Sequence, residues 1–191
     1  PIGQYVMRQA LNFLTQWQNA DQQQYTMAVN LSPRQFRDMG LLSFIENTLR
    51  ESNISSKYLE LEVTEGVLMS GQSYIHQALE QINELGIKLS MDDFGTGYSS
   101  LSYLRQYPFD VLKIDRSFIN GITLNEADYN LVKATIAMSH SLGLTVVAEG
   151  VETKEQLLLL RDLDCDFIQG YYFSKPIPAM QLLEFSARYY Q

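Results

Sequence analysis

Residues 87–92, Ile-Lys-Leu-Ser-Met-Asp, carry the pattern that decides the fold: apolar and polar side chains alternate, and the run ends on an acidic residue. A period of two is typical of a β-strand whose two faces have different surroundings. Five further β-rich runs occur, at 25–31, 58–63, 110–115, 144–149 and 166–171. Segments with helical periodicity separate them, which predicts parallel strands joined by right-handed crossovers.

The helical segments have signals of their own. Residues 3–19 repeat apolar side chains at helical spacing and predict one amphipathic helix before the first strand. The same spacing recurs ahead of Gly86 and Gly143. Because glycine is common just after the last turn of a helix, both positions are expected to be helix ends.

The two faces of the predicted strands differ consistently, since side chains two residues apart share a face. One face is apolar and suits packing beneath helices: Met27, Val29, Leu59, Leu61, Val63, Leu89, Met91, Leu112, Ile114, Val146 and Ala148. The other face places polar residues at or near the C-terminal strand ends: Asn30, Glu62, Asp92, Lys113, Asp115, Glu149 and Gln169. Such an arrangement predicts an α/β fold of the (β/α)₈ TIM-like barrel type, with the active site at that end.

A doubly wound open sheet is the competing architecture, but it would leave both sides of its central strands apolar. The polar inward face therefore favours the barrel. A barrel has eight strands and typically about 250 residues, whereas six strands are predicted in the 191 residues present. We expect residues 1–191 to form one partial domain without its N-terminal strands, and a dimer to cover the exposed strand edges.

Composition narrows the functional classes. The formal net charge of −8 argues against binding to a nucleic-acid polymer, which needs clustered Lys and Arg. A small phosphorylated ligand remains compatible, because a bound metal can supply positive charge. The single cysteine, Cys165, indicates a reducing, cytoplasmic environment. No run of about 18 apolar residues occurs, so we expect no membrane contact by this segment.

Asp92 and Asp93 begin the richest motif, Asp-Asp-Phe-Gly-Thr-Gly-Tyr-Ser-Ser-Leu at 92–101. Adjacent carboxylates at a strand end can bind hard divalent ions such as Mg²⁺ or Mn²⁺. The alternative is a strand-to-helix turn in which Asp caps a helix and Gly supplies unusual backbone angles. Glu62 and Asn30 are expected at the same end of the sheet, which favours the metal site.

Three more polar positions suit chemistry at this end. Lys113 is an inward ammonium, which is costly unless carboxylates surround it, and near a phosphate it can stabilise developing charge. Its structural alternative is an ion pair with Asp115 or Asp92. Glu149 is a candidate general base, and Gln169 can orient a water or a ligand oxygen.

Six segments in order resemble the EAL domain family. They are Val-Asn-Leu-Ser from residue 29, Leu-Glu-Val-Thr-Glu from 61, the motif at 92–101, Lys-Ile-Asp-Arg-Ser-Phe from 113, Ala-Glu-Gly-Val-Glu from 148 and Gln-Gly-Tyr from 169. The resemblance implies a barrel that hydrolyses the bacterial messenger cyclic di-GMP to linear pGpG, using two Mg²⁺ or Mn²⁺ ions. Two metal ions about 4 Å apart can generate a hydroxide and clamp the attacking and leaving oxygens.

The resemblance also assigns roles to individual residues. Metal binding falls on Asn30, Glu62, Asp92 and Asp93. Roles in catalysis fall on Glu149, Lys113, Gln169 and Asp93. Substrate contacts fall on Asp115, Glu152 and Gly170. Glu65 looks like the anchor of the loop at 93–104, which in such proteins links metal binding to dimer contacts.

The Glu-Ala-Leu segment that names the family, with its metal-binding Glu, has no counterpart in these 191 residues. We therefore expect weak or no hydrolysis by this segment alone. The resemblance implies upstream sensory or GGDEF-type domains in the parent protein. Domains outside this segment can anchor the parent protein to a membrane. The alternatives are a cyclic di-GMP receptor without activity, a hydrolase for another phosphodiester, and an interaction domain; retention of every motif position within the chain favours the enzyme.

Overall fold

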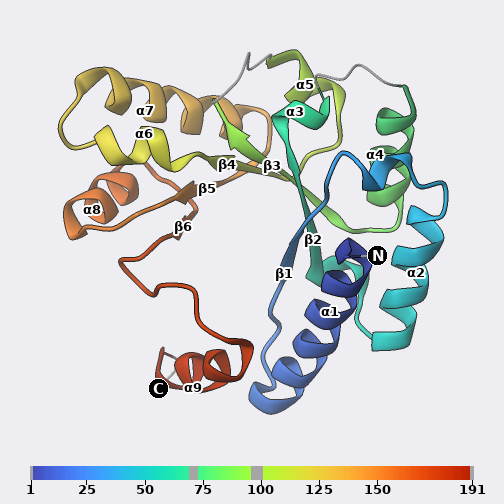
Figure 1. Ribbon diagram of the computed structural model, residues 1–191. Helices are drawn as coiled ribbons and strands as arrows, with labels where there is room; N and C mark the ends of the chain where they lie inside the picture. Colours follow the sequence, from blue (N-terminus) through green and yellow to red (C-terminus); the bar gives the residue numbers. More distant parts are fainter. Residues whose placement is uncertain (1, 69–72, 96–100, 190–191) are drawn as a thin grey trace. The chain divides into compact units, whose positions relative to one another are not determined.

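The computed structural model describes residues 2–68, 73–95 and 101–189, and over these it contains six β-strands separated by helices (Figure 1). The strands are β1 (Met27–Asn30), β2 (Leu59–Thr64), β3 (Lys88–Phe94), β4 (Val111–Ile114), β5 (Thr145–Glu149) and β6 (Phe167–Gln169). They follow one another in the sheet in chain order, and the pairings are parallel. A doubly wound sheet reverses its strand order at a switch point, so the sequential order supports the predicted barrel-type winding.

Helices alternate with the strands as the periodicity predicted. They are α1 (Ile2–Asp21), α2 (Leu41–Ser52), α3 (Glu65–Leu68), α4 (Ser73–Glu84), α5 (Leu101–Gln106), α6 (Arg116–Gly121), α7 (Glu126–Ser141), α8 (Lys154–Asp162) and α9 (Ala179–Tyr189), with short 3₁₀ turns η1 (Gln35–Arg37) and η2 (Ser56–Tyr58). The helix predicted at 3–19 is α1. Gly86 and Gly143 both have φ of 77° beyond the ends of α4 and α7, which confirms them as helix-end glycines.

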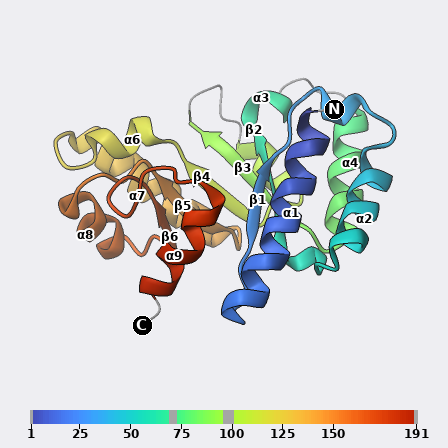
Figure 2. The same ribbon diagram turned by 60° about the horizontal axis from the view of Figure 1, so that its bottom comes forward.

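The chain divides into two compact units. Unit 1 comprises residues 1–62, 72–88 and 176–191, and unit 2 comprises residues 63–71 and 89–175. In unit 1, α1 lies beside β1 and packs on α2 (Figure 2), with Met7, Leu11 and Leu14 fully buried. Trp17 Nε1 donates a hydrogen bond to Ser186 Oγ at 3.1 Å, which ties α9 to α1.

In unit 2, α6 and α7 pack together and against β5 (Figure 1). The strand side chains predicted to face helices are buried there, among them Leu112, Ile114, Val146 and Ala148. Val132 of α7 is also fully buried. The predicted apolar face is therefore confirmed, apart from Met27 at the start of β1, which is only half-buried.

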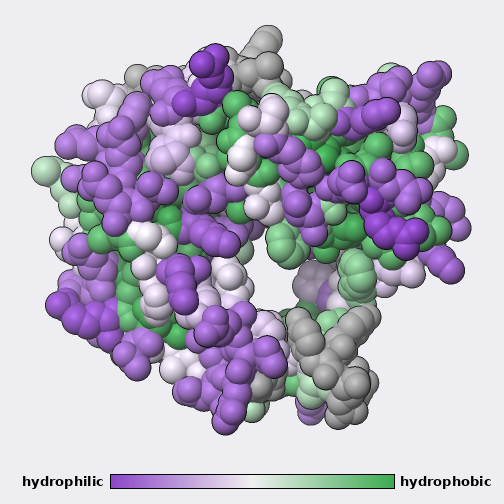
Figure 3. Space-filling view, turned by 180° about the vertical axis from the view of Figure 1, so that it is seen from behind, coloured by the Kyte–Doolittle hydropathy of each residue, from purple (hydrophilic) through white to green (hydrophobic). Residues whose placement is uncertain are grey.

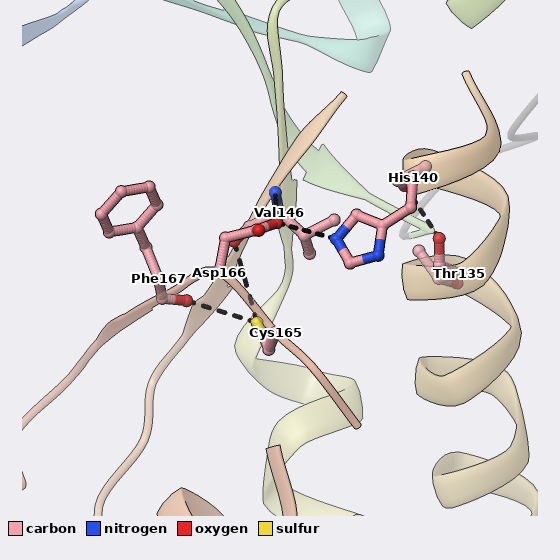
Figure 4. Close-up of polar contacts among 7 residues, drawn as sticks. Thr135, His140, Val146, Cys165, Asp166 and Phe167 are labelled. Carbon is pink, nitrogen blue, oxygen red and sulfur yellow. Dashed lines mark hydrogen bonds and ion pairs between the residues drawn. The ribbon is translucent and has the colours of Figure 1, made fainter. Parts of the chain in front are cut away.

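Aspartates secure the N-terminal ends of the unit 2 strands. Asp110 Oδ2 accepts the Leu89 N–H at 2.9 Å. Asp166 Oδ2 accepts the Val146 N–H at 2.8 Å and contacts His140 Nε2 at 2.9 Å (Figure 4). Burial raises the pKa of Asp166, but the hydrogen bonds from Val146 and His140 outweigh it and hold the pKa below its usual value.

The thiol of Cys165, next to Asp166 in the chain, lies at the same N-terminal ends of the strands. Cys165 Sγ lies 3.3 Å from the Phe167 carbonyl oxygen, and burial raises the thiol pKa to about 11 (Figure 4). A thiol with such a pKa is almost entirely protonated at neutral pH, so Cys165 is a packing residue rather than a nucleophile.

Hydrophilic residues cover much of the face seen in Figure 3, with apolar residues exposed between them. Among the residues that the structure describes, no helix combines the length and the hydrophobicity that a membrane span requires.

Candidate metal and catalytic site

β3 ends in an irregularity that presents Asp92 and Asp93. Its register with β4 shifts between Met91 and Phe94, and Asp93 adopts the left-handed conformation with φ of 58°. Gly95 follows with φ of 97°, which L side chains rarely adopt. Because a bulge interrupts the strict alternation of side chains, two successive carboxylates can serve the same end of the strand.

Lys113 of β4 lies between two carboxylates of unit 2. Its Nζ is 3.1 Å from Asp92 Oδ1 and 2.8 Å from Glu149 Oε1. The ammonium is buried, with the side chain only 6% exposed, and two opposite charges offset the cost of removing it from water. The predicted ion pair with Asp92 is confirmed, and Glu149 is added to it.

Asp115 was predicted as the last residue of the strand, and this boundary is wrong. β4 ends at Ile114, and Asp115 is the N-cap of α6, where its Oδ1 accepts the Ser117 N–H at 3.0 Å. An aspartate at this position satisfies a helix N–H that has no partner within the helix. Burial raises the pKa of Asp115, but the hydrogen bonds from Ser117 outweigh it, so that the pKa is lowered.

Asp92, Asp93 and Glu149 form a three-carboxylate cluster, since each offers an oxygen and these oxygens lie within 4.8 Å of one another. Asp92 Oδ1 is buried and accepts no hydrogen bond, its contact being the Lys113 ammonium. Burial, followed by the charges of Asp92 and Asp115, raises the pKa of Asp93, and Lys113 opposes this. A divalent cation would relieve both conditions, so the donor set fits a hard metal ion.

Unit 1 brings together two of the other predicted ligands. Asn30 of β1 and Glu62 of β2 are register partners, and Asn30 Nδ2 donates to Glu62 Oε2 at 2.8 Å. Glu62 is 7% exposed. The Asn30 amide nitrogen donates to Glu62, and the amide oxygen, an acceptor, is of the kind that hard metal ions bind.

The ends of β5 and β6 place Glu149 beside Gln169, which are register partners. The chain beyond them is held closely: Val151 N–H donates to the Gln169 carbonyl at 3.1 Å. A Cβ at Gly170 would lie 2.1 Å from the Val151 carbonyl oxygen, so only glycine fits there. Glu152 is exposed, and its N–H donates to Gln156 Oε1 at 2.8 Å.

Glu65 begins α3 and is only 4% exposed. The loop that it was predicted to anchor, 93–104, includes residues 96–100, which lie outside the described residues, so this role remains a prediction. Glu149 has more possible roles than the sequence indicated: it was assigned as a base, and its oxygen also belongs to the carboxylate cluster. Its inward parity was the signal that could have suggested this.

Comparison with known proteins identifies the family. The model of the EAL domain matches residues 1–176. The cyclic di-GMP phosphodiesterase NbdA of Pseudomonas aeruginosa is 43% identical over 188 residues, which are 98% of this chain and 24% of NbdA. The chain thus spans about a quarter of the length of the curated relatives it matches.

Solved structures agree in fold. The PaMucR phosphodiesterase in complex with c-di-GMP has a TM-score of 0.89 and 40% identity, covering 95% of this chain and 73% of that one. Klebsiella pneumoniae BlrP1, in a manganese and cyclic di-GMP complex, has a TM-score of 0.84 and 27% identity, covering 91% of this chain and 44% of that one. These likenesses confirm the incomplete (β/α)₈ barrel class. The chain belongs to the EAL domain family.

Proposed function

We propose that this chain binds cyclic di-GMP and, with divalent metal ions, takes part in its hydrolysis to linear pGpG. The observation that carries the proposal is the cluster of Asp92, Asp93 and Glu149 around the buried Lys113 ammonium. The motif positions predicted for the family occur in the chain, and similar proteins are named as phosphodiesterases. An anionic phosphodiester needs such charge neutralisation before water can attack it.

Two Mg²⁺ or Mn²⁺ ions would be held by Asn30, Glu62, Asp92 and Asp93. When bound, such ions lower the pKa of water and neutralise charge on the phosphate. The manganese in the BlrP1 complex supports this choice of metal. The closeness of carboxylate oxygens of Asp92, Asp93 and Glu149, all within 4.8 Å of one another, supports Asp92 as a ligand.

The protein side chains orient the reacting groups. Lys113 fixes Asp92 and Glu149 through its two ion pairs, and its ammonium would stabilise the negative charge that develops on the phosphate. Glu149 accepts the proton of the attacking water, and Gln169, its register partner, orients that water. These roles deepen the sequence-based assignments and remain part of the proposal.

Substrate contacts are proposed for Asp115, Glu152 and Gly170. For Asp115, the carboxylate oxygen that does not cap α6 would make the contact. We further propose a homodimer and a cytoplasmic site of action, the latter from the single, protonated cysteine. Two relatives support further domains in the parent protein: the bifunctional diguanylate cyclase/cyclic di-GMP phosphodiesterase MucR of Pseudomonas aeruginosa and the oxygen sensor protein DosP of Escherichia coli, of which the chain covers 27% and 23%.

The test is to add cyclic di-GMP and Mn²⁺ to the chain, to measure binding by calorimetry and to quantify pGpG by chromatography. We expect Mn²⁺-dependent binding and slow product formation, and Glu149→Gln should bind cyclic di-GMP while forming no product. The same assay on the parent protein separates enzyme from receptor, because this segment alone is expected to show weak or no hydrolysis: binding by the parent without any product would favour a receptor. Absence of binding would overturn the proposal.

A further inference from the structure

An aromatic ring lies against the turn that follows the metal-binding carboxylates. A Cβ built at Gly95 would be 2.6 Å from Phe118 Cε2 and 2.9 Å from its Cζ. The φ of 97° at Gly95 already requires glycine. The ring of Phe118 therefore fills the space that a side chain at residue 95 would take, two residues beyond Asp93.

The position of Phe118 is fixed by the same segment that delivers Lys113. α6 begins at Arg116 after its cap, Asp115, whose carbonyl accepts the Phe118 N–H at 3.1 Å. Two residues before this cap, Lys113 forms its ion pair with Asp92. One short stretch, residues 113–118, thus contacts the Asp92–Gly95 turn twice, once by charge and once by packing.

A void of about 20 Å³ adjoins this contact. It is lined by Gly95 and Phe118 and by Leu131, Val132 and Thr135 of α7, so its lining is mainly apolar. Shortening the Phe118 ring would enlarge it, and the turn at Gly95 could then move into the space.

We propose that Phe118 is a positioning residue for the metal site: its ring supports the Gly95 turn and thereby keeps the Asp92 and Asp93 carboxylates at the spacing that a divalent cation needs. The inference rests on the proposed function, which supplies the metal. It differs from a general packing role, because it predicts a loss of metal affinity larger than that from an equal ring deletion elsewhere.

The test compares Phe118→Leu and Phe118→Ala with Phe109→Leu. Phe109 precedes the other end of β4 and is 8% exposed, so its substitution removes a similar ring away from the carboxylates. Mn²⁺ affinity is measured by calorimetry, and the melting temperature is measured without metal. We expect the Kd for Mn²⁺ to rise about tenfold in Phe118→Ala and less in Phe118→Leu, as for other residues that support metal ligands. Phe109→Leu should lower the melting temperature only.

Each outcome decides the question. Wild-type Kd in Phe118→Leu and Phe118→Ala, or equal weakening in Phe109→Leu, overturns the inference while the proposed function stands. If Phe118→Ala does not fold, Phe118→Leu against Phe109→Leu carries the comparison alone. A wild-type chain that binds no Mn²⁺ overturns the proposed metal site, and the inference with it.

Discussion

At the N-terminal ends of the unit 2 strands, Asp110 and Asp166 accept backbone N–H groups, whereas at the C-terminal ends Asp92 and Glu149 face the Lys113 ammonium. Backbone donors are permanent parts of the fold, so the first pair of carboxylates stabilises strand positions. The second pair depends on a side-chain cation and can accept another one. The difference matches the division of a barrel into a stability face and an active-site face.

Among the substitutions considered, Asp92→Asn, at the C-terminal ends of the strands, should have the largest effect on Mn²⁺ binding and hydrolysis. Removing the negative charge of this proposed ligand is expected to reduce Mn²⁺ affinity and Mn²⁺-dependent hydrolysis by about 100-fold. The measurement is pGpG formation together with calorimetric titration of Mn²⁺. Asp110→Ala is the matched control at the other end: it should keep Mn²⁺ affinity and lose stability, because the N–H of buried Leu89 loses its acceptor.

Lys113→Met tests whether the carboxylates at the C-terminal ends of the unit 2 strands need a cation for the stability of the fold. Without Lys113, Asp92 and Glu149 repel each other in a poorly solvated place, so the free energy of unfolding should fall by about 3 kcal/mol in metal-free buffer. Urea unfolding measures it, and Mn²⁺ should restore part of the loss. A variant as stable as wild type without metal would contradict the electrostatic account of this end.

Asp166→Ala tests whether the carboxylates at the N-terminal ends of the unit 2 strands stabilise the fold. Val146 is fully buried, and the substitution leaves its N–H without its acceptor, so the free energy of unfolding should fall by about 2 kcal/mol at pH 7. Because the folded-state pKa of Asp166 is lowered, its stabilisation is complete above the unfolded pKa of about 4 and is lost as the pH falls through the folded value. The difference in unfolding free energy between wild type and variant should therefore shrink only below about pH 4; a constant difference down to pH 2 would exclude this linkage.

His140→Ala should have the smallest effect. Its contact with Asp166 is more than one-third exposed on both sides, and exposed pairs contribute about 0.5 kcal/mol. Thermal unfolding at low and high salt measures this. If His140→Ala lost as much stability as Asp166→Ala, the stabilising contact of Asp166 would be the one with His140 rather than the hydrogen bond from the Val146 N–H.

Local pattern predicted much of this molecule. The alternation around Asp92, the helical spacing of α1 and the glycines after α4 and α7 depend on neighbouring residues only, so they can be recognised from the sequence alone. The inward parity of Lys113 and Glu149 also followed from counting along their strands. The bulge at Asp93 did not follow, because strict alternation contains no signal for a shift in register with the next strand.

The sequence by itself determined the order of strands and helices, the apolar and polar faces, and the motifs that mark the EAL family. Only the tertiary structure decided which charges meet: Lys113 with Asp92 and Glu149, Asp166 with Val146 and His140, Asp115 with the first turn of α6. It also decided that Phe118 supports Gly95. The physical reason is that most of these contacts join residues 20 to 36 positions apart in the chain, and their geometry depends on strand register and helix packing, which local periodicity does not contain.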